Sequence, residues 1–148
     1  MKTKDQGQLG ENLARSFLEN IGYQLIESNF VRRVGEIDLV MLAPPDPQHM
    51  HSAVVFVEVR YRTSADFGGA LGSINLRKQR KMVRAANAWL PKNASSTLTA
   101  RIDVITLEPL SAHTNGERSS LNNPLSPHEH SWQHHRLRWI PNAVEELT

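Results

Sequence analysis

Residues 35–42 read GEIDLVML and residues 53–62 read AVVFVEVRYR. Both segments are rich in β-branched and apolar residues, which predicts two strands. The side chains of a strand point alternately to its two faces, so Glu36 and Asp38 are expected to share one face of the first strand. The opposite face should carry the apolar residues Ile37, Leu39 and Met41. The first strand therefore combines an apolar face with a face that carries two acids.

The second strand repeats this pattern, because Glu58 and Arg60 alternate with apolar residues. The Pro-rich sequence APPDPQHMHS between the strands predicts an antiparallel hairpin centred near Gln48. Symmetric pairing about this loop sets apolar residues opposite each other at the loop end and charged residues opposite each other at the far end. The expected pairs are Leu42 with Val54, Val40 with Phe56, Asp38 with Glu58, and Glu36 with Arg60.

This register brings two carboxylates together. Directly opposed residues have Cβ atoms roughly 4.5–5.5 Å apart, and like charges there destabilise a sheet. Two carboxylates about 4 Å apart repel by roughly 4 kcal/mol at an effective dielectric near 20. Arg60 would relieve part of this repulsion, and a divalent cation would relieve more. Asp38 and Glu58 are therefore the predicted ligands of Mg²⁺ or Mn²⁺, since Mg²⁺ typically takes one or two carboxylates with water and substrate phosphate. The alternative is a solvated strand face whose acids only form surface ion pairs.

The rest of the chain predicts an αβββαβ order with a mixed sheet flanked by helices, which is an α/β or α+β fold. The further elements are expected as a helix over 8–21, a strand over 23–30, a helix over 74–90 that ends at Pro91, and a strand over 100–107. Residues 109–135 lack periodic apolar positions and predict a long flexible loop. Residues 136–147 predict a short strand followed by one or two helical turns.

The composition fits a single domain over residues 1–148, with 39% hydrophobic and 22% charged residues. The chain contains no cysteine, so disulfides and thiolate metal sites are excluded. The first residues show no apolar signal-peptide core, and no apolar run approaches membrane-spanning length, so a cytoplasmic protein without membrane contact is expected. The net charge is only +2, so the distribution of charge matters more than its total.

The N-terminal half of the predicted helix over 74–90 is strongly basic. It carries five basic residues and no acid between Arg77 and Arg84, a track suited to phosphates. The candidate DNA-binding residues are Arg77, Lys78, Gln79, Arg80, Lys81 and Arg84. The alternative is an ordinary solvated helix face.

Five histidines cluster toward the C-terminus, at His113, His128, His130, His134 and His135. Spacings such as HEH and HH in a low-complexity segment without cysteine are only a weak zinc signal. These histidines are expected to be loop residues without a structural metal.

Several motifs together resemble the YraN-like family of candidate bacterial endonucleases. The resemblance rests on Gly10–Glu11, GEIDLV at 35–40, VFVEVRYR at 55–62, the basic helix, RIDVI at 101–105 and WIPNAVE near the end. It covers most of residues 7–108. That family resembles Holliday-junction resolvases and the wider PD-(D/E)xK nuclease fold, which implies a restriction-endonuclease-like core.

By this resemblance Asp38 and Glu58 are metal ligands, Glu11 and Glu36 are supporting acids, and Arg60 stands where the superfamily has a lysine. Arginine stays protonated and cannot act as a base, but its planar fork can bind a phosphate. For Glu11, a plain surface glutamate is an equally good interpretation, because it falls at the border of the apolar side of its helix.

The resemblance implies a Mg²⁺-dependent endonuclease that hydrolyses phosphodiester bonds of double-stranded or branched DNA. It also makes a homodimer reasonable, although no dimer surface is evident in the sequence. Two alternatives stay open: a non-catalytic nucleic-acid-binding module that keeps the fold, and an interaction protein whose acids only form ion pairs.

Overall fold

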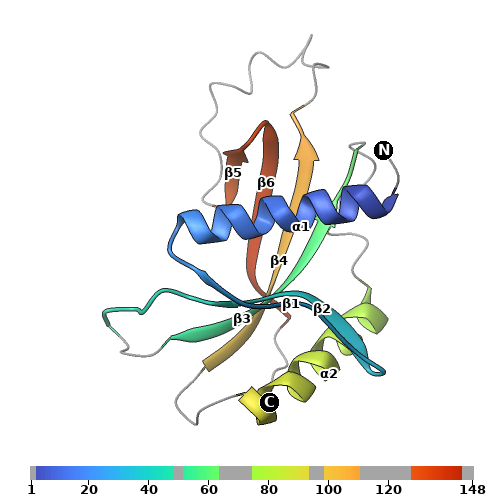
Figure 1. Cartoon of the computed structure of the whole chain (residues 1–148), viewed down its shortest axis with the longest axis vertical. Helices are drawn as coiled ribbons and strands as arrows, with labels where there is room; N and C mark the ends of the chain where they lie inside the picture. Colours follow the sequence, from blue (N-terminus) through green and yellow to red (C-terminus); the bar gives the residue numbers. More distant parts are fainter. Residues whose placement is uncertain (1–2, 49–51, 64–74, 94–98, 111–127, 145–148) are drawn as a thin grey trace.

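The computed structural model describes residues 3–48, 52–63, 75–93, 99–110 and 128–144 (Figure 1). These residues form two helices and six strands. In chain order they are α1 (Thr3–Asn20), β1 (Gln24–Arg32), β2 (Gly35–Leu42), β3 (Ala53–Tyr61), α2 (Leu76–Asn93), β4 (Thr99–Pro109), β5 (Glu129–Trp132) and β6 (His135–Val144). The first six follow the predicted αβββαβ order. Neither of the two described helices has the length and apolar character needed to cross a membrane.

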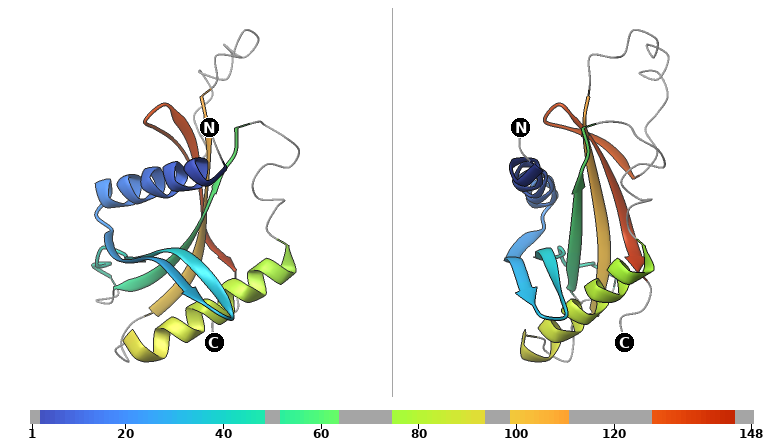
Figure 2. Two further views of the ribbon diagram at one scale, coloured as in Figure 1. Left: turned by 45° about the vertical axis from the view of Figure 1, so that its right-hand side comes forward. Right: turned by 90° about the vertical axis from the view of Figure 1, so that its right-hand side faces the viewer.

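The strands form one mixed sheet in the order β1-β2-β3-β4-β6-β5. Strands β3 and β4 are parallel and are connected through α2, whereas the other neighbouring strands are antiparallel. Helix α1 packs on one face of the sheet and α2 on the other (Figure 2). The mixed sheet flanked by helices confirms the predicted fold class.

Helix α1 buries one side because its apolar residues recur at helical spacing. Leu13, Ala14, Phe17 and Leu18 are buried in the core between α1 and the sheet. The strand residues of this core are Leu39, Met41, Val55, Val57, Ile105, Leu107 and Leu137.

Helix α2 forms the second core, on the opposite face, through Met82, Ala85, Ala86 and Trp89. The Trp89 ring meets the Phe56 ring edge-on, with centroids 5.6 Å apart. The other large buried strand residues of this core are Phe30, Ile37, Val40, Val54 and Ile102. Since α1 and α2 cover opposite faces, alternate residues of β3 reach different cores.

Three parts of the chain differ from the sequence prediction. Helix α2 continues through Pro91 to Asn93, although a proline inside a helix removes a hydrogen bond and crowds the preceding turn. Strand β5 lies inside the stretch 109–135 that was predicted to be a loop, and it pairs with β6; residues 111–127 of that stretch lie outside the described residues. Strand β6 runs to Val144, so no helical turn begins before that residue, and pairing with β4 satisfies its backbone instead.

Candidate functional site

Strands β2 and β3 pair over only part of their length. The observed pairs are Leu42 with Val54, Met41 with Val55, Val40 with Phe56 and Leu39 with Val57. The predicted register is therefore confirmed at the loop end, but the expected pairs of Asp38 with Glu58 and of Glu36 with Arg60 are not part of the ladder. Where the ladder ends, the Asp38 carboxylate accepts a hydrogen bond from the backbone N–H of Val59 at 2.8 Å. The Asp38 side chain thus replaces a backbone partner between the two strands.

The alternation of β2 breaks at Asp38. Ile37 packs in the α2 core together with Val40, whereas Leu39 packs in the α1 core together with Met41. The prediction that Ile37 shares a face with Leu39 and Met41 is therefore wrong. A strict period of two assumes regular pairing, and the irregularity at Asp38 could not be seen in the sequence.

Asn29 of β1 lies opposite this irregularity, between the paired residues Ser28 and Phe30. Its φ of 54° is in the left-handed region, which asparagine tolerates better than most residues. The Asn29 side chain forms a hydrogen bond with Glu11. The sequence analysis missed Asn29, because a single asparagine in a predicted strand gives no sign of its partner.

Asp38 and Glu58 form a pair of carboxyl groups that share a hydrogen bond, and Glu58 is only 5% exposed. Burial first, and the charge of Glu58 second, raise the pKa of Asp38 from 3.8 to about 8. Burial also raises the pKa of Glu58, although the charge of Arg60 opposes this change. Near neutral pH the two carboxyl groups therefore retain a proton. A bound metal cation would displace this proton and neutralise the carboxylates in its place.

Glu11 of α1 joins this pair of acids. Its side chain forms hydrogen bonds with Asn29 and Asp38, and burial raises its pKa. The helix comes close to β3 here because Gly10 lacks a side chain. A Cβ at Gly10 would lie 3.0 Å from Cβ of Tyr61. Glu11 is therefore directed toward the acids and is not a plain surface glutamate.

Two cationic side chains face Glu58. The Lys78 Nζ lies 3.1 Å from Glu58 Oε1, and an Arg60 terminal nitrogen lies 3.4 Å from the same oxygen. The Arg60 Nε is buried and has no hydrogen-bond partner among the described residues. Because a guanidinium carries five N–H donors, Arg60 retains donor capacity for an anion. Lys78 thus brings an ammonium group from α2 to the acids.

A groove of about 610 Å³ lies over Glu58, between the β1–β2 turn and the first turns of α2. Its lining contains five basic residues: Arg32, Arg33, Arg77, Lys78 and Lys81. Arg32 and Arg33 were not among the predicted DNA-binding residues, although the adjacent arginines before GEID were visible in the sequence. The exposed Glu36 lines the same groove, and its charge contributes to the raised pKa of Glu11.

Asn75 also lines this groove and immediately precedes α2. Its side-chain oxygen accepts the backbone N–H of Lys78 at 2.9 Å, which caps the helix. The cap directs the N-terminus of α2, the end that favours negative charge, toward the groove.

The other predicted DNA-binding residues do not line this groove. Gln79, Arg80 and Arg84 line a separate hollow of about 480 Å³ with Val83 and the end of β6. The basic residues of α2 therefore lie beside two different hollows, and the prediction that they bind DNA stays a prediction.

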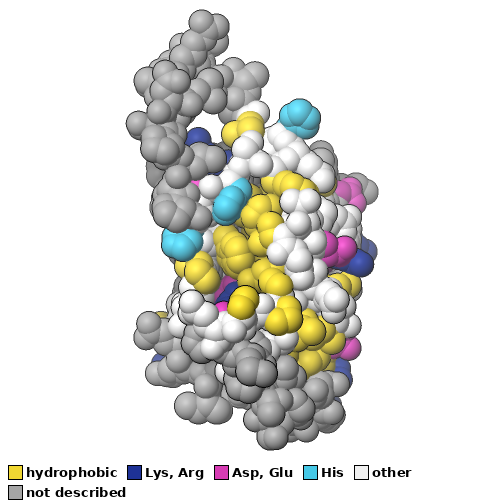
Figure 3. Space-filling model, turned by 90° about the vertical axis from the view of Figure 1, so that its left-hand side faces the viewer, with side chains coloured by type: hydrophobic (Ala, Val, Ile, Leu, Met, Phe, Trp, Pro, Cys, Tyr) yellow, Lys and Arg dark blue, Asp and Glu magenta, His cyan; other side chains and the backbone are white. Residues whose placement is uncertain are grey.

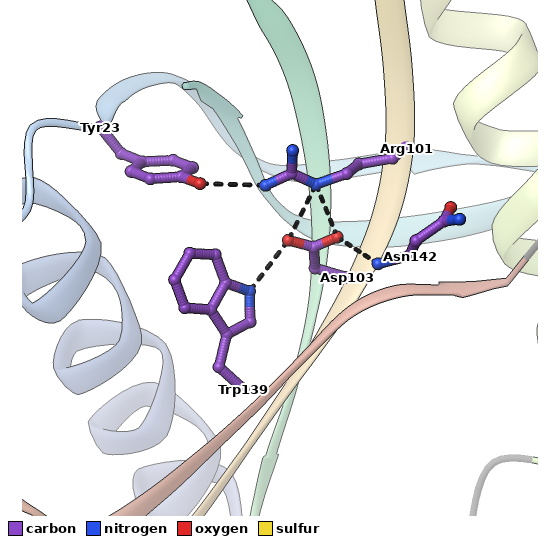
Figure 4. A network of polar contacts seen from close by, with 5 residues as sticks. All are labelled: Tyr23, Arg101, Asp103, Trp139 and Asn142. Carbon is purple, nitrogen blue, oxygen red and sulfur yellow. Dashed lines mark hydrogen bonds and ion pairs between the residues drawn. The ribbon is translucent and has the colours of Figure 1, made fainter. Parts of the chain in front are cut away.

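Asp103 of RIDVI belongs to a separate polar network, shown in Figure 4. It is fully buried, and its carboxylate accepts N–H groups from Arg101 at 3.0 Å, from the Trp139 ring at 2.9 Å and from the Asn142 backbone at 2.8 Å. Arg101 also donates to the Tyr23 hydroxyl at 2.9 Å. The network ties β4, β6 and the start of β1 together, which is a structural role.

The described histidines do not form a cluster. On the face drawn in Figure 3, histidine side chains (cyan) lie along the margin of a band of apolar side chains. His130 packs on Phe17, with ring centroids 4.9 Å apart, and His135 Nε2 lies 3.1 Å from the Tyr61 hydroxyl. His113 lies outside the described residues.

Within the described parts of the chain, no three His, Cys, Asp or Glu side chains are arranged as a complete metal site. Asp38 and Glu58 still offer two adjacent carboxyl groups, with Glu11 hydrogen-bonded to Asp38. This all-oxygen donor set fits Mg²⁺ or Mn²⁺, which complete their coordination with water and substrate oxygens.

Residues 10–107 match the model of a known protein family, and this range contains the acids and Lys78. A UPF0102 protein of Photobacterium profundum is 40% identical over 110 residues, which cover 73% of this chain and 82% of that protein. A UPF0102 protein of Pseudomonas putida is 45% identical over 103 residues, which cover 69% of this chain and 78% of that protein. The chain therefore belongs to the uncharacterised protein family UPF0102.

Proposed function

We propose that this protein binds DNA and hydrolyses its phosphodiester bonds with Mg²⁺ or Mn²⁺. One observation carries the proposal: the half-buried Asp38 and the buried Glu58 form a carboxyl pair, and Glu58 lines a groove whose lining carries five basic residues. Basic side chains attract the phosphate backbone, while paired acids attract a cation. A site that combines both suits a metal-dependent reaction at a phosphate.

The residues around Glu58 have separate roles in this proposal. Asp38 and Glu58 hold the cation, and Glu11 with its partner Asn29 orients Asp38. Arg60 and Lys78 bind oxygens of the phosphate that is attacked, because charge accumulates on these oxygens in the transition state. Water adds to phosphorus and one P–O ester bond breaks, leaving a hydroxyl and a phosphate monoester. The cation, when bound, would supply charge neutralisation and a more acidic water.

The basic residues farther along the groove bind the flanking phosphates. Arg77 and Lys81 of α2 and Arg33 of the β1–β2 turn line opposite sides of the groove. A phosphate backbone that lies between them would pass over Glu58. Branched DNA and a homodimeric assembly are further expectations of the resemblance, and they form part of this proposal.

A non-catalytic DNA-binding module is the second candidate. Two ion pairs favour it, because Lys78 and Arg60 already neutralise the charge of Glu58 without a bound cation. In that case DNA would bind in the same groove but remain intact.

A cleavage assay separates the two candidates. The protein is incubated with linear, nicked and branched DNA, with Mg²⁺, with Mn²⁺ and with EDTA, and products are separated on denaturing gels. We expect cleavage that requires the metal and that is lost in Asp38→Asn and Glu58→Gln. Glu108→Gln, which alters a half-exposed acid paired with Arg136 on β6, is the matched control and should cleave normally. DNA binding without cleavage of any substrate would favour the non-catalytic module.

A further inference from the structure

The turn between β1 and β2 combines exposed apolar and basic side chains. We count in it Val31 and Arg32, the last two residues of β1, and the turn residues Arg33 and Val34, and the pair of Arg32 with Gly35 closes it. Val31 is 57% exposed and Val34 is 41% exposed, and both arginines are exposed. Two exposed β-branched apolar residues, one in the turn and one at the end of β1 beside it, are candidates for contact with a partner.

The turn is held in place by its own contacts and by α2. The Arg32 guanidinium lies 4.3 Å from the centre of the Phe30 ring and donates to the Val31 carbonyl at 2.7 Å. Gly35 packs directly on the α2 backbone, since a Cβ at this position would lie 2.4 Å from the Lys81 carbonyl oxygen. The turn is therefore a preorganised projection and its position relative to the basic helix is fixed.

This projection belongs to the same groove as the acids. Val31, Arg32 and Arg33 line the groove together with Glu58. DNA whose backbone lies over Glu58 would therefore meet the turn within a few nucleotides. None of the described residues that line the groove is aromatic, so the groove lacks the stacking platform that single-stranded nucleic acid requires.

The side chains of the turn suit another mode of contact. Proteins that bend DNA insert apolar side chains between base pairs from the minor groove, and arginine is favoured there by the negative potential. We propose that residues 31–34 form a wedge that unstacks one base step of duplex DNA and kinks the duplex. Val31 and Val34 contact the base step, while Arg32 and Arg33 hold the flanking phosphates. This inference rests on the DNA-binding part of the proposed function and not on hydrolysis.

The test uses polar and apolar replacements of the same two valines. Val31→Thr with Val34→Thr keeps the shape and the preference for strands but adds two hydroxyl groups, whereas Val31→Ile with Val34→Ile stays apolar. Ile26→Thr is the matched control, because Ile26 is 44% exposed on the same strand but does not line the groove. Thermal melting of all variants first verifies that they are folded.

Two fluorescence signals report the deformation, in EDTA so that no DNA is cleaved. Energy transfer between dyes at the ends of a duplex reports a kink, and 2-aminopurine beside a central TA step reports unstacking. We expect the wild type, the Ile pair and Ile26→Thr to raise both signals. The Thr pair should bind roughly tenfold more weakly, a difference of about 1.4 kcal/mol, and should raise neither signal at saturation.

The outcomes separate the wedge from the proposed function. Two results would overturn the wedge and leave DNA binding intact. In the first, the wild type binds DNA without a change in either fluorescence signal. In the second, the Thr pair raises both signals as the wild type does. Absence of DNA binding by every variant would overturn both proposals. Kinking by the wild type without cleavage in Mg²⁺ would support the wedge and reject hydrolysis.

Discussion

The backbone N–H of Val59 donates a 2.8 Å hydrogen bond to the Asp38 carboxylate at the point where the pairing of β2 and β3 ends. This bond favours the charged form of Asp38, but burial and the Glu58 charge outweigh it and raise the pKa of Asp38 to about 8. The backbone therefore holds a carboxyl group in a position where its charge is unfavourable. A bound cation would instead favour the charged form of Asp38. The stability of the protein should therefore depend on the metal, on the pH and on this side chain.

The first prediction concerns the substitution Asp38→Asn. Asparagine keeps the shape and the acceptor oxygen for Val59 but removes the charge that opposes Glu58. In metal-free buffer at pH 9 the variant should be more stable than the wild type, by up to a few kcal/mol. Mg²⁺ or Mn²⁺ should raise the melting temperature of the wild type but not that of Asp38→Asn, because a ligand that binds the native state stabilises it.

Melting curves of both proteins, with and without the metal, check this prediction. Glu108→Gln is the control and should respond to the metal like the wild type. Destabilisation by Asp38→Asn together with no metal effect on the wild type would identify Asp38 as a structural residue.

The second prediction is the pH dependence of stability. A carboxyl group with a higher pKa in the folded state binds its proton more tightly there, so the free energy of unfolding falls as the pH rises between the two pKa values. For Asp38 this range runs from 3.8 to about 8. Urea unfolding of the metal-free wild type should therefore show lower stability at pH 8.5 than at pH 5.5. The decrease should be smaller in Asp38→Asn, and equal decreases in the two proteins would show that other groups cause it.

The third prediction concerns the two cations that share one oxygen of Glu58. Removing the sole partner of a buried charge is strongly destabilising, typically by about 3–5 kcal/mol. Lys78→Met and Arg60→Met each leave Glu58 one cation, so each should cost less than that. The double variant should cost more than the sum of the single variants. A double-mutant cycle from urea unfolding measures this coupling, and simple additivity would show that the two cations act independently.

The sequence predicted the elements of the site better than its geometry. The hairpin register was correct from Leu42 to Val40, because apolar pairs determine which face of each strand is buried. It failed at Asp38, where a side chain replaces a backbone partner and the alternation reverses. The register prediction considers only hydrogen bonds between backbones, so it could not anticipate that the Asp38 side chain takes the place of one backbone partner.

The contributions of distant segments were the hardest to predict. The position of β1 in the sheet brings Asn29, Arg32 and Arg33 to the site, and the sequence does not show this position. Strand β5 was assigned to a loop because its four residues show no clear alternation. The basic residues of α2 between Arg77 and Arg84 were also treated as one set of candidate DNA-binding residues. The structure divides them between two hollows because the β1–β2 turn packs on that helix.

This division gives the fourth prediction. It compares two double variants that change the net charge equally. The first combines Arg77→Glu with Lys81→Glu, and the second combines Arg80→Glu with Arg84→Glu. Only the residues of the first pair line the groove beside Glu58. The first pair should weaken DNA binding strongly and reduce the slope of log K against log salt by about 1.8, since each phosphate contact contributes about 0.9. Fluorescence anisotropy at several salt concentrations measures both effects. A larger loss in the second pair would place the DNA in the other hollow.

The last prediction tests whether the β1–β2 turn is held against α2. In Gly35→Ala the new methyl group would lie 2.4 Å from the Lys81 carbonyl oxygen, so either the turn or the helix must move. Such overpacking typically costs about 1–3 kcal/mol. Gly7→Ala is the matched control, because a Cβ at this helical position meets nothing within 4 Å and alanine should stabilise the helix by about 0.5–1 kcal/mol. The two substitutions add the same methyl group, so urea unfolding should show opposite signs, and a folded Gly35→Ala should also bind DNA more weakly because the groove is displaced. Equal stability of Gly35→Ala and the wild type would mean that the turn does not rest on α2 and that the groove is not fixed by this contact.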